Sequence, residues 1–185
     1  MNLNAKSNLF KFVFPVGFFP EKIVKKYERY LEKSQIPYKN FNDFINSTIQ
    51  SVTIPTLNGE IVEQKGNYRV AQKWRSGFEA IRSIERSFTV EFKLVESFMN
   101  YFAFMEAFLD FYSFQNKYEY LGDMTLEIYD TDLLRTLKIK YGSVLYKDIS
   151  TPITFNHGDV RNQFKTFSIN FAYNNLDIDF DFEED

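Results

Sequence analysis

Residues 87–114 read SFTVEFKLVESFMNYFAFMEAFLDFYSF, and this stretch decides the class of fold. In Ser87–Val95, apolar and polar residues alternate, which predicts a strand with one buried and one exposed face. From Phe98 to Phe114 the apolar residues recur at helical spacing, and Ser97 is placed to cap such a helix. Because this helix is apolar almost all round, we expect it to be covered on more than one side.

Three segments farther along the chain repeat the strand pattern: Met124–Tyr129, Leu134–Tyr141 and Lys165–Tyr173. Each has one apolar and one polar face, which is typical of antiparallel sheets wrapped around a single core. Asp130-Thr131-Asp132 suits a hairpin connection between the first two. We therefore predict a mainly β (α+β) fold, an antiparallel β-sandwich or barrel with one buried aromatic helix, as a single domain over residues 1–185.

The N-terminal part adds two strands and two helices to this prediction. The expected elements are a strand at Asn8–Phe14, a surface helix at Glu21–Lys33, a short helix at Asn40–Asn46 capped by Asn40, and a strand at Ile49–Ile54. The segment 15–46 is predicted to be a helical insertion within the domain.

Residues 57–86 form the least core-like portion and predict a polar extended hairpin. Its arms are expected at Glu60–Gln64 and Tyr68–Trp74, turning at Lys65-Gly66-Asn67. A long polar hairpin is not stable in isolation, so we expect it to pack against another subunit.

Composition excludes several classes of function. The net charge is −3, which argues against a general affinity for nucleic-acid phosphates, and the absence of Cys excludes disulfides and thiolate sites. No uncharged apolar run approaches the roughly 20 residues that a bilayer requires, so no membrane association is expected. Aromatic residues make up 19% of the chain, which indicates either contact surface beyond the core or simply an AT-rich genome.

No pattern of residues predicts catalysis. The single His157 has no partner at a diagnostic spacing and is interpreted as a turn residue. No nucleophile elbow, phosphate-binding loop or metal motif is present, so we predict no catalytic, cofactor-binding or metal-binding residue, and no enzyme.

Two charged segments are candidates for contacts between subunits. Asp177–Asp185 places six acidic residues in nine. It is either an acidic surface that repels DNA phosphates or binds a basic partner, with a Ca²⁺ site also possible, or the end of a solvated acidic tail over 174–185. A basic cluster with aromatic neighbours lies in the polar hairpin and favours a protein contact over nucleic acid. The hypothesis is that the two segments pair between copies. The candidate contact residues are Tyr68, Arg69, Trp74, Arg75, Arg82, Asp177, Asp179 and Asp181.

The order of these elements resembles the tail tube proteins of contractile-tailed bacteriophages and related injection systems. The segments that carry the resemblance are Ser51-Val-Thr-Ile-Pro55, Arg86-Ser-Phe-Thr-Val-Glu-Phe92, Leu121-Gly-Asp-Met-Thr-Leu126 and the closing strand within 163–173. The segment 15–46 and the acidic end depart from the family pattern.

The resemblance implies a virion structural protein, assembled in the host cytoplasm and located in the tail. Six copies would form a ring whose joined sheets line a channel, and the polar hairpin would reach to the next ring. An acidic channel would let DNA pass without specific binding, and other tail, baseplate or connector proteins would be partners. One alternative is a different ring, such as a tube initiator or terminator. Another is a monomeric β-sandwich that binds peptide or glycan through exposed Tyr and Trp74.

Overall fold

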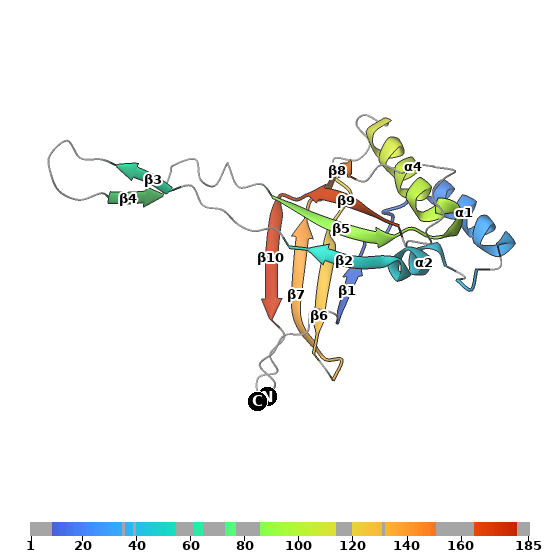
Figure 1. The fold of residues 1–185 in the computed structure, drawn as a ribbon, viewed down its shortest axis with the longest axis horizontal. Coiled ribbons are helices and arrows are strands. Elements are labelled where there is room, and N and C mark those ends of the chain that lie inside the picture. Colours follow the sequence, from blue (N-terminus) through green and yellow to red (C-terminus); the bar gives the residue numbers. More distant parts are fainter. Residues whose placement is uncertain are drawn as a thin grey trace.

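The computed structural model describes residues 9–34, 36–38, 40–54, 61–64, 73–76, 86–113, 120–130, 132–150 and 165–180. Over these residues the chain forms two four-stranded antiparallel sheets, a separate two-stranded hairpin, and helices gathered on one side of the sheets (Figure 1). The prediction of a mainly β (α+β) sandwich is confirmed.

Sheet A has the strand order β1-β6-β7-β10, and every neighbouring pair is antiparallel. Its strands are β1 (Phe10–Val13), β6 (Met124–Tyr129), β7 (Arg135–Gly142) and β10 (Asn175–Phe180). The bounds of β6 match the prediction. By contrast, β10 lies in the segment that was interpreted as either a contact surface or an acidic tail.

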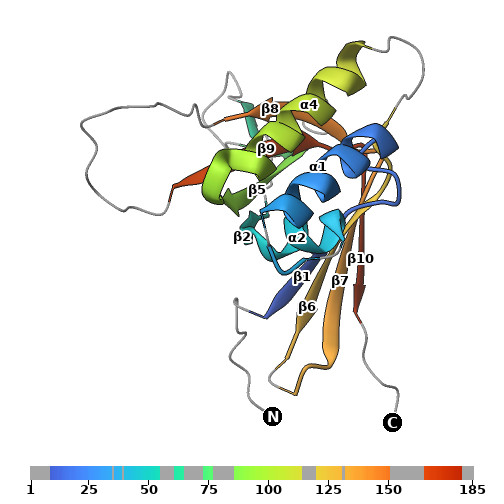
Figure 2. The same cartoon turned by 90° about the vertical axis from the view of Figure 1, so that its right-hand side faces the viewer.

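Sheet B has the order β2-β5-β9-β8, again antiparallel throughout. Its strands are β2 (Ile49–Thr53), β5 (Ser87–Lys93), β9 (Thr166–Ala172) and β8 (Leu145–Ile149), of which β8 was not predicted. The strands of sheet B run across those of sheet A, so the two sheets pack crosswise (Figures 1 and 2).

Stacked aromatic rings join the two sheets. The Phe88 ring of β5 stacks on Tyr141 of β7, with 4.2 Å between ring centroids and 24° between planes. It also stacks on Phe171 of β9 at 5.3 Å. All three side chains are buried, and such offset pairs add to the stability gained from burial itself.

The helices extend this core. Helix α1 (Glu21–Lys33) has the predicted bounds and buries Ile23, Tyr27 and Leu31, while α2 (Phe41–Ser47) is capped by Asn40 as expected. Phe19, between β1 and α1, contacts rings of α2 and of the long aromatic helix α4 (Met99–Ser113). The segment 15–46 therefore supplies part of the single core; that it is an insertion relative to the family stays a prediction.

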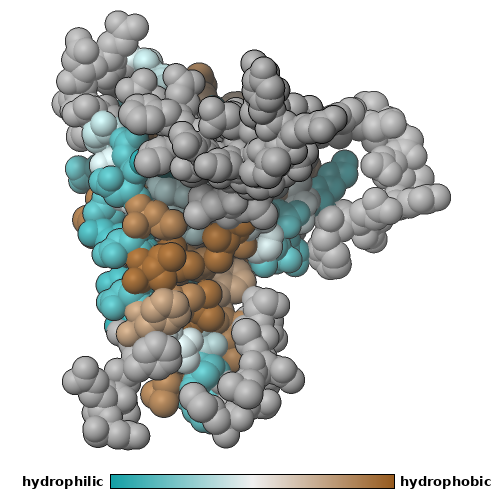
Figure 3. Space-filling model, turned by 90° about the vertical axis from the view of Figure 1, so that its left-hand side faces the viewer, coloured by the Kyte–Doolittle hydropathy of each residue, from teal (hydrophilic) through white to brown (hydrophobic). Residues whose placement is uncertain are grey.

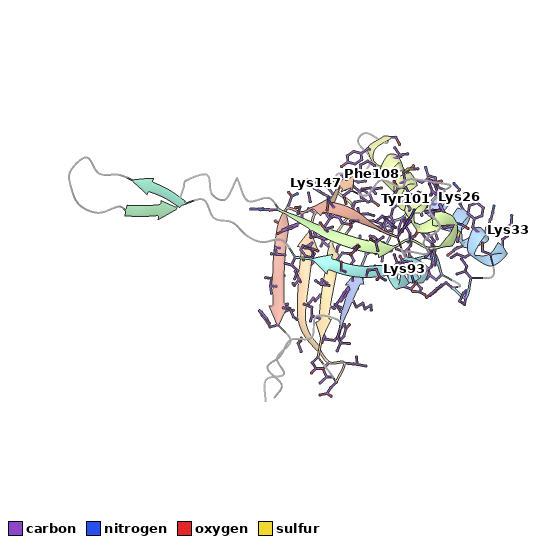
Figure 4. The ribbon with its side chains drawn as sticks, in the orientation of Figure 1. Lys26, Lys33, Lys93, Tyr101, Phe108 and Lys147 are labelled. Atoms are coloured by element: carbon purple, nitrogen blue, oxygen red, sulfur yellow. The ribbon has the colours of Figure 1, made fainter. Side chains whose placement is uncertain are left out.

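Helix α4 is covered on two sides, and a third side is exposed. Tyr101 and Phe108 lie toward sheet B (Figure 4), where they contact Phe167 and Tyr146 at 5.3 and 5.5 Å. On the α1 side, ion pairs join Lys22 to Asp110 and Lys26 to Glu106. The exposed side carries Phe102, Leu109 and Tyr112.

The predicted Ser97 cap is wrong. Ser97 and Phe98 have φ values of +67° and +55° and belong to the 3₁₀ turn η1 (Glu96–Phe98), whereas a capping residue has extended backbone. The side chain of the fully buried Asn100 instead holds this junction. Its Nδ2 donates to the Lys93 carbonyl at 2.7 Å, and its Oδ1 accepts from the Tyr101 amide at 3.0 Å.

The polar hairpin pairs β3 (Ile61–Gln64) with β4 (Lys73–Ser76) and lies away from both sheets (Figure 1). Gln64 stands opposite Lys73, so the second arm pairs farther along the chain than predicted. The predicted turn at 65–67 lies outside the described residues.

We expect Asn100→Ala to lower the free energy of unfolding by about 1–3 kcal/mol, because the Lys93 carbonyl then loses its buried donor. Asn42→Ala is the matched control, since Asn42 is also the second residue of a helix but is exposed. Denaturant unfolding measures both. Equal stability losses would contradict this role for Asn100.

We expect one substitution to have opposite effects at two tyrosines. The Tyr112 hydroxyl donates to the Tyr146 carbonyl, so Tyr112→Phe should destabilise by about 1 kcal/mol. The buried Tyr146 hydroxyl has no hydrogen-bond partner among the described residues, so Tyr146→Phe should stabilise by a similar amount.

The Tyr146 contribution also depends on pH. Burial raises the pKa of Tyr146 well above its usual value near 10, so above pH 10 the tyrosine ionises in the unfolded chain before it ionises in the folded one. The protein therefore loses stability as the pH rises above 10, and Tyr146→Phe removes this loss. Unfolding curves at neutral and alkaline pH test both points. A loss of stability in Tyr146→Phe at neutral pH would contradict the first, and an equal alkaline loss in Tyr146→Phe and in the unaltered protein would contradict the second.

Candidate functional site, the two edges of sheet A

The two faces of sheet A have different chemistry. One face packs against sheet B and buries Met124, Leu126, Ile139 and Tyr141. Because side chains alternate along a strand, the intervening residues lie on the other face, which is polar and points away from the core. We call it the polar face of sheet A.

Acidic and basic side chains alternate from strand to strand across the polar face. The pairs that stand opposite each other in register are Asp177–Lys140, Asp179–Lys138, Glu127–Lys138 and Lys11–Glu127. Opposite charges on neighbouring strands stabilise a sheet. In the spatial order of the strands, the polar face is therefore basic at β1, acidic at β6, basic at β7 and acidic at β10.

Ion pairs at the ends of these strands continue the pattern. Lys140 Nζ lies 2.9 Å from Asp123 Oδ2, and Arg135 Nη1 lies 3.4 Å from Glu127 Oε1. The hydrogen bond from Lys140, together with the Ser143 amide, lowers the pKa of the Asp123 carboxyl below its usual value. Over the described part of sheet A, four basic residues face four acidic ones: Lys11, Arg135, Lys138 and Lys140 against Asp123, Glu127, Asp177 and Asp179.

Both outer strands of sheet A have an open edge. Among the described strands, β1 pairs only with β6, and β10 pairs only with β7. Every residue of β10 is exposed, including Leu176 at 39% and Ile178 at 50%. Figure 3 shows the side of the molecule where β10 lies, with a hydrophobic patch bordered by hydrophilic residues. An exposed edge with apolar side chains is a template for pairing with another chain.

The open edges of β1 and β10 complement each other. Their directions are opposite, because three antiparallel steps separate them in the sheet. Two copies related by rotation about an axis along the strands would therefore join β10 to β1 in antiparallel fashion. On both edges apolar residues flank charged ones, with Lys11 on β1 and Asp177 and Asp179 on β10. Joining the edges would place these opposite charges side by side.

The residues predicted from the sequence are divided between two places. Asp177 and Asp179 lie on β10, opposite Lys140 and Lys138 of the same chain. Trp74 and Arg75 lie on β4, in the separate hairpin. The structure does not bring these two groups together in one chain. Tyr68, Arg69, Arg82, Asp181 and His157 lie outside the described residues, so the predicted pairing of the acidic end with the hairpin stays a prediction.

Sequence reasoning placed Lys138 and Lys140 on a polar strand face that could line a channel, but it missed Lys11 and the pairing of the two lysines with Asp177 and Asp179. A signal was present, because Lys138-Ile-Lys140 and Asp177-Ile-Asp179 have the same spacing and opposite charge. Two alternating segments of this kind match each other as neighbouring strands. None of the described helices is long and apolar enough to span a membrane.

Comparison with known proteins gives matches in structure alone. No protein-family model and no curated protein matches the sequence. A chain of the anti-feeding prophage baseplate, solved by cryo-EM with six-fold symmetry, is 13% identical with a TM-score of 0.53, covering 96% of this chain and 97% of that chain. A chain of the anti-feeding prophage tube-terminating cap is 9% identical with a TM-score of 0.54, covering 97% and 93%.

A third similar structure is the sheath–tube complex of an extracellular contractile injection system in its extended state. The match is 11% identical with a TM-score of 0.54, and covers 97% of this chain and 94% of that chain. At these identities the likeness shows the fold. The chain therefore has the fold found in tube, cap and baseplate components of contractile injection systems, as its sequence resemblance predicted.

Proposed function

We propose that this chain is a structural subunit of a ring that stacks into a phage-type tail tube. The observation that carries the proposal is the complementarity of the two open edges of sheet A. Joining β10 of each copy to β1 of the next extends sheet A around an axis, and a ring that closes leaves no edge unpaired. The six-fold symmetry of the similar baseplate structure supports a ring of six copies.

In such a ring the polar face of sheet A lines the channel, because sheet B covers the opposite face. The four basic and four acidic residues described on this face balance, so together they give the wall no net charge to attract DNA. This differs from the acidic channel that was expected together with the resemblance to tail tube proteins. DNA passes such a wall without specific binding, because the lysines of the wall already face carboxylates of neighbouring strands.

The hairpin β3–β4 then makes contacts outside its own chain. It is a two-stranded element set apart from the sheets, and such elements need a partner for stability. Trp74, Arg75 and the remaining basic residues of 57–86 are proposed to contact neighbouring copies. In this proposal, tail, baseplate or connector proteins bind at the ends of the tube. The chain itself has a structural role in the tail and no catalytic role.

A ring at the end of a tube is a second candidate. The TM-scores of the baseplate, cap and sheath–tube matches lie between 0.53 and 0.54, so the fold suits a terminal ring equally well. Such a ring would use the same edges of sheet A and would differ in whether it stacks on copies of itself.

Two complementary variants test the joining of edges. Lys11→Glu makes both edges acidic, whereas Asp177→Lys/Asp179→Lys makes both edges basic. We expect each variant alone to stay monomeric because every junction would oppose like charges. Mixed in equal amounts, they should form rings in which the two alternate, which requires an even number of copies.

Mass photometry and negative-stain microscopy measure the outcome. Lys25→Glu is the control, since Lys25 is exposed on α1 and lies outside sheet A. Circular dichroism checks that each variant is folded. Rings formed by either charge variant alone, or no rings in the mixture, would refute the edge contact.

A further inference from the structure

An apolar turn and a largely apolar pocket with a charged rim of Glu21, Lys22 and Asp110 lie at opposite ends of sheet A. One is the tip of the β6–β7 hairpin, which carries Leu133 and Leu134, and the other is a pocket at the end where β1 stops and β6 begins. We propose that the leucine tip of each copy docks into this pocket on a copy in the adjacent ring. This rests on the proposed ring and names the surfaces by which rings stack.

The tip exposes two leucines on a constrained turn. Leu133 is 70% exposed and Leu134 is 61% exposed. Leu133 has a φ of +61°, a left-handed conformation that hairpin turns usually reserve for Gly, Asn or Asp. A large apolar residue held in a disfavoured conformation at a tip is a feature found at contact sites. This turn therefore presents the leucines at some cost to its own stability.

The described residues of the tip, Asp130 and 132–134, make backbone hydrogen bonds within the turn. Asp130 Oδ1 accepts from the Asp132 amide at 2.8 Å and from the Leu134 amide at 2.9 Å. The Leu133 amide donates to the Asp130 carbonyl at 3.3 Å, and the Asp130 amide to the Leu134 carbonyl at 2.9 Å. Burying a backbone group without a partner is costly, so this network lets the tip enter an apolar site cheaply.

The pocket suits an apolar tip. Its volume is about 540 Å³, within the range of pockets that bury small ligands. Its apolar lining residues are Val16, Phe18, Pro20, Ala107, Phe111, Tyr120 and Leu121. Three charged residues also line it, of which Glu21 pairs with Lys25. Val16 is fully exposed at the surface beside Gly17, whose φ of +82° turns the chain here. The Lys22–Asp110 ion pair lies among the lining residues and satisfies both charges.

The connectivity of sheet A puts the two features on opposite faces of a ring. Val13 at the end of β1 pairs with Thr125 at the beginning of β6, so the residues before β6 and after β1 share one end. The β6–β7 hairpin is at the other end, and Figure 2 shows it far from the helices. Barrel strands tilt by about 35–45° from the axis, which keeps these ends on opposite faces.

A second copy is the occupant that this arrangement favours. In rings stacked head to tail on one axis, the tip face of each ring meets the pocket face of the next. Such a contact is heterologous, because a tip on one ring binds a pocket on the next. Every added ring leaves a free pocket or tip for a further ring, so stacking produces an open filament.

Cysteine cross-linking tests the contact, because the chain contains no Cys. The double variant Val16→Cys/Leu134→Cys, oxidised as assembled tubes, should give a ladder of cross-linked chains that reductant removes. Single rings isolated by size should give no ladder. A ladder in isolated rings, or none in tubes, would overturn the proposal.

A second variant separates contact from folding. Leu133→Gly/Leu134→Asn relieves the left-handed strain and removes the apolar side chains, so we expect a folded chain that forms rings but no tubes. Leu109→Asn is the control, since Leu109 is also exposed, at 58%, but lies on α4. Tubes of unaltered length from the tip variant would overturn the proposal. Absence of rings in the unaltered protein would instead refute the proposed function.

Discussion

The stacking of Phe88 on Tyr141 is the contact on which the rest of the structure depends. It fixes the apolar face of sheet A against the apolar face of sheet B, and Phe171 and the helix rings extend the same layer. Once these faces are buried, the polar face of sheet A can only point outward. The proposed channel wall is in this sense a consequence of the core, because the same alternation that buries Ile139 exposes Lys138 and Lys140.

Charge decides where sheet A ends. Asp177 and Asp179 would repel each other in an isolated strand. For this reason the sequence pattern did not predict a strand at the acidic end. In the folded chain they stand opposite Lys140 and Lys138, and the repulsion is compensated by β7. The outer edge of β10 has no such neighbour among the described strands, so the acidic row remains available to a basic edge such as β1.

Local patterns in the sequence predicted helices and strands correctly, whereas they did not predict contacts between distant segments. Helix α1 and strand β6 were predicted to the residue because their periodicity is strong and their ends are marked by Pro, Gly or charge. The Ser97 cap failed because the buried Asn100 side chain reaches back to β5, a tertiary contact that no spacing reveals. The candidate surface was predicted in part. Its acidic residues and the lysines of β7 were named, but their pairing depends on which strands become neighbours, and periodicity does not reveal that.

The number of strands in sheet A has one more consequence. In the proposed ring, four strands of alternating direction make every junction between copies antiparallel, whatever the number of copies. Hydrogen bonding between the edges therefore does not set the number of copies in the ring. That number must follow from the curvature of the ring. The curvature depends on the wedge shape of each subunit, with thin sheet A inside and a thicker layer of sheet B and helices outside. A residue buried deep in that outer layer, such as Phe19 or Phe41, could set the bore of the channel without ever touching what passes through it.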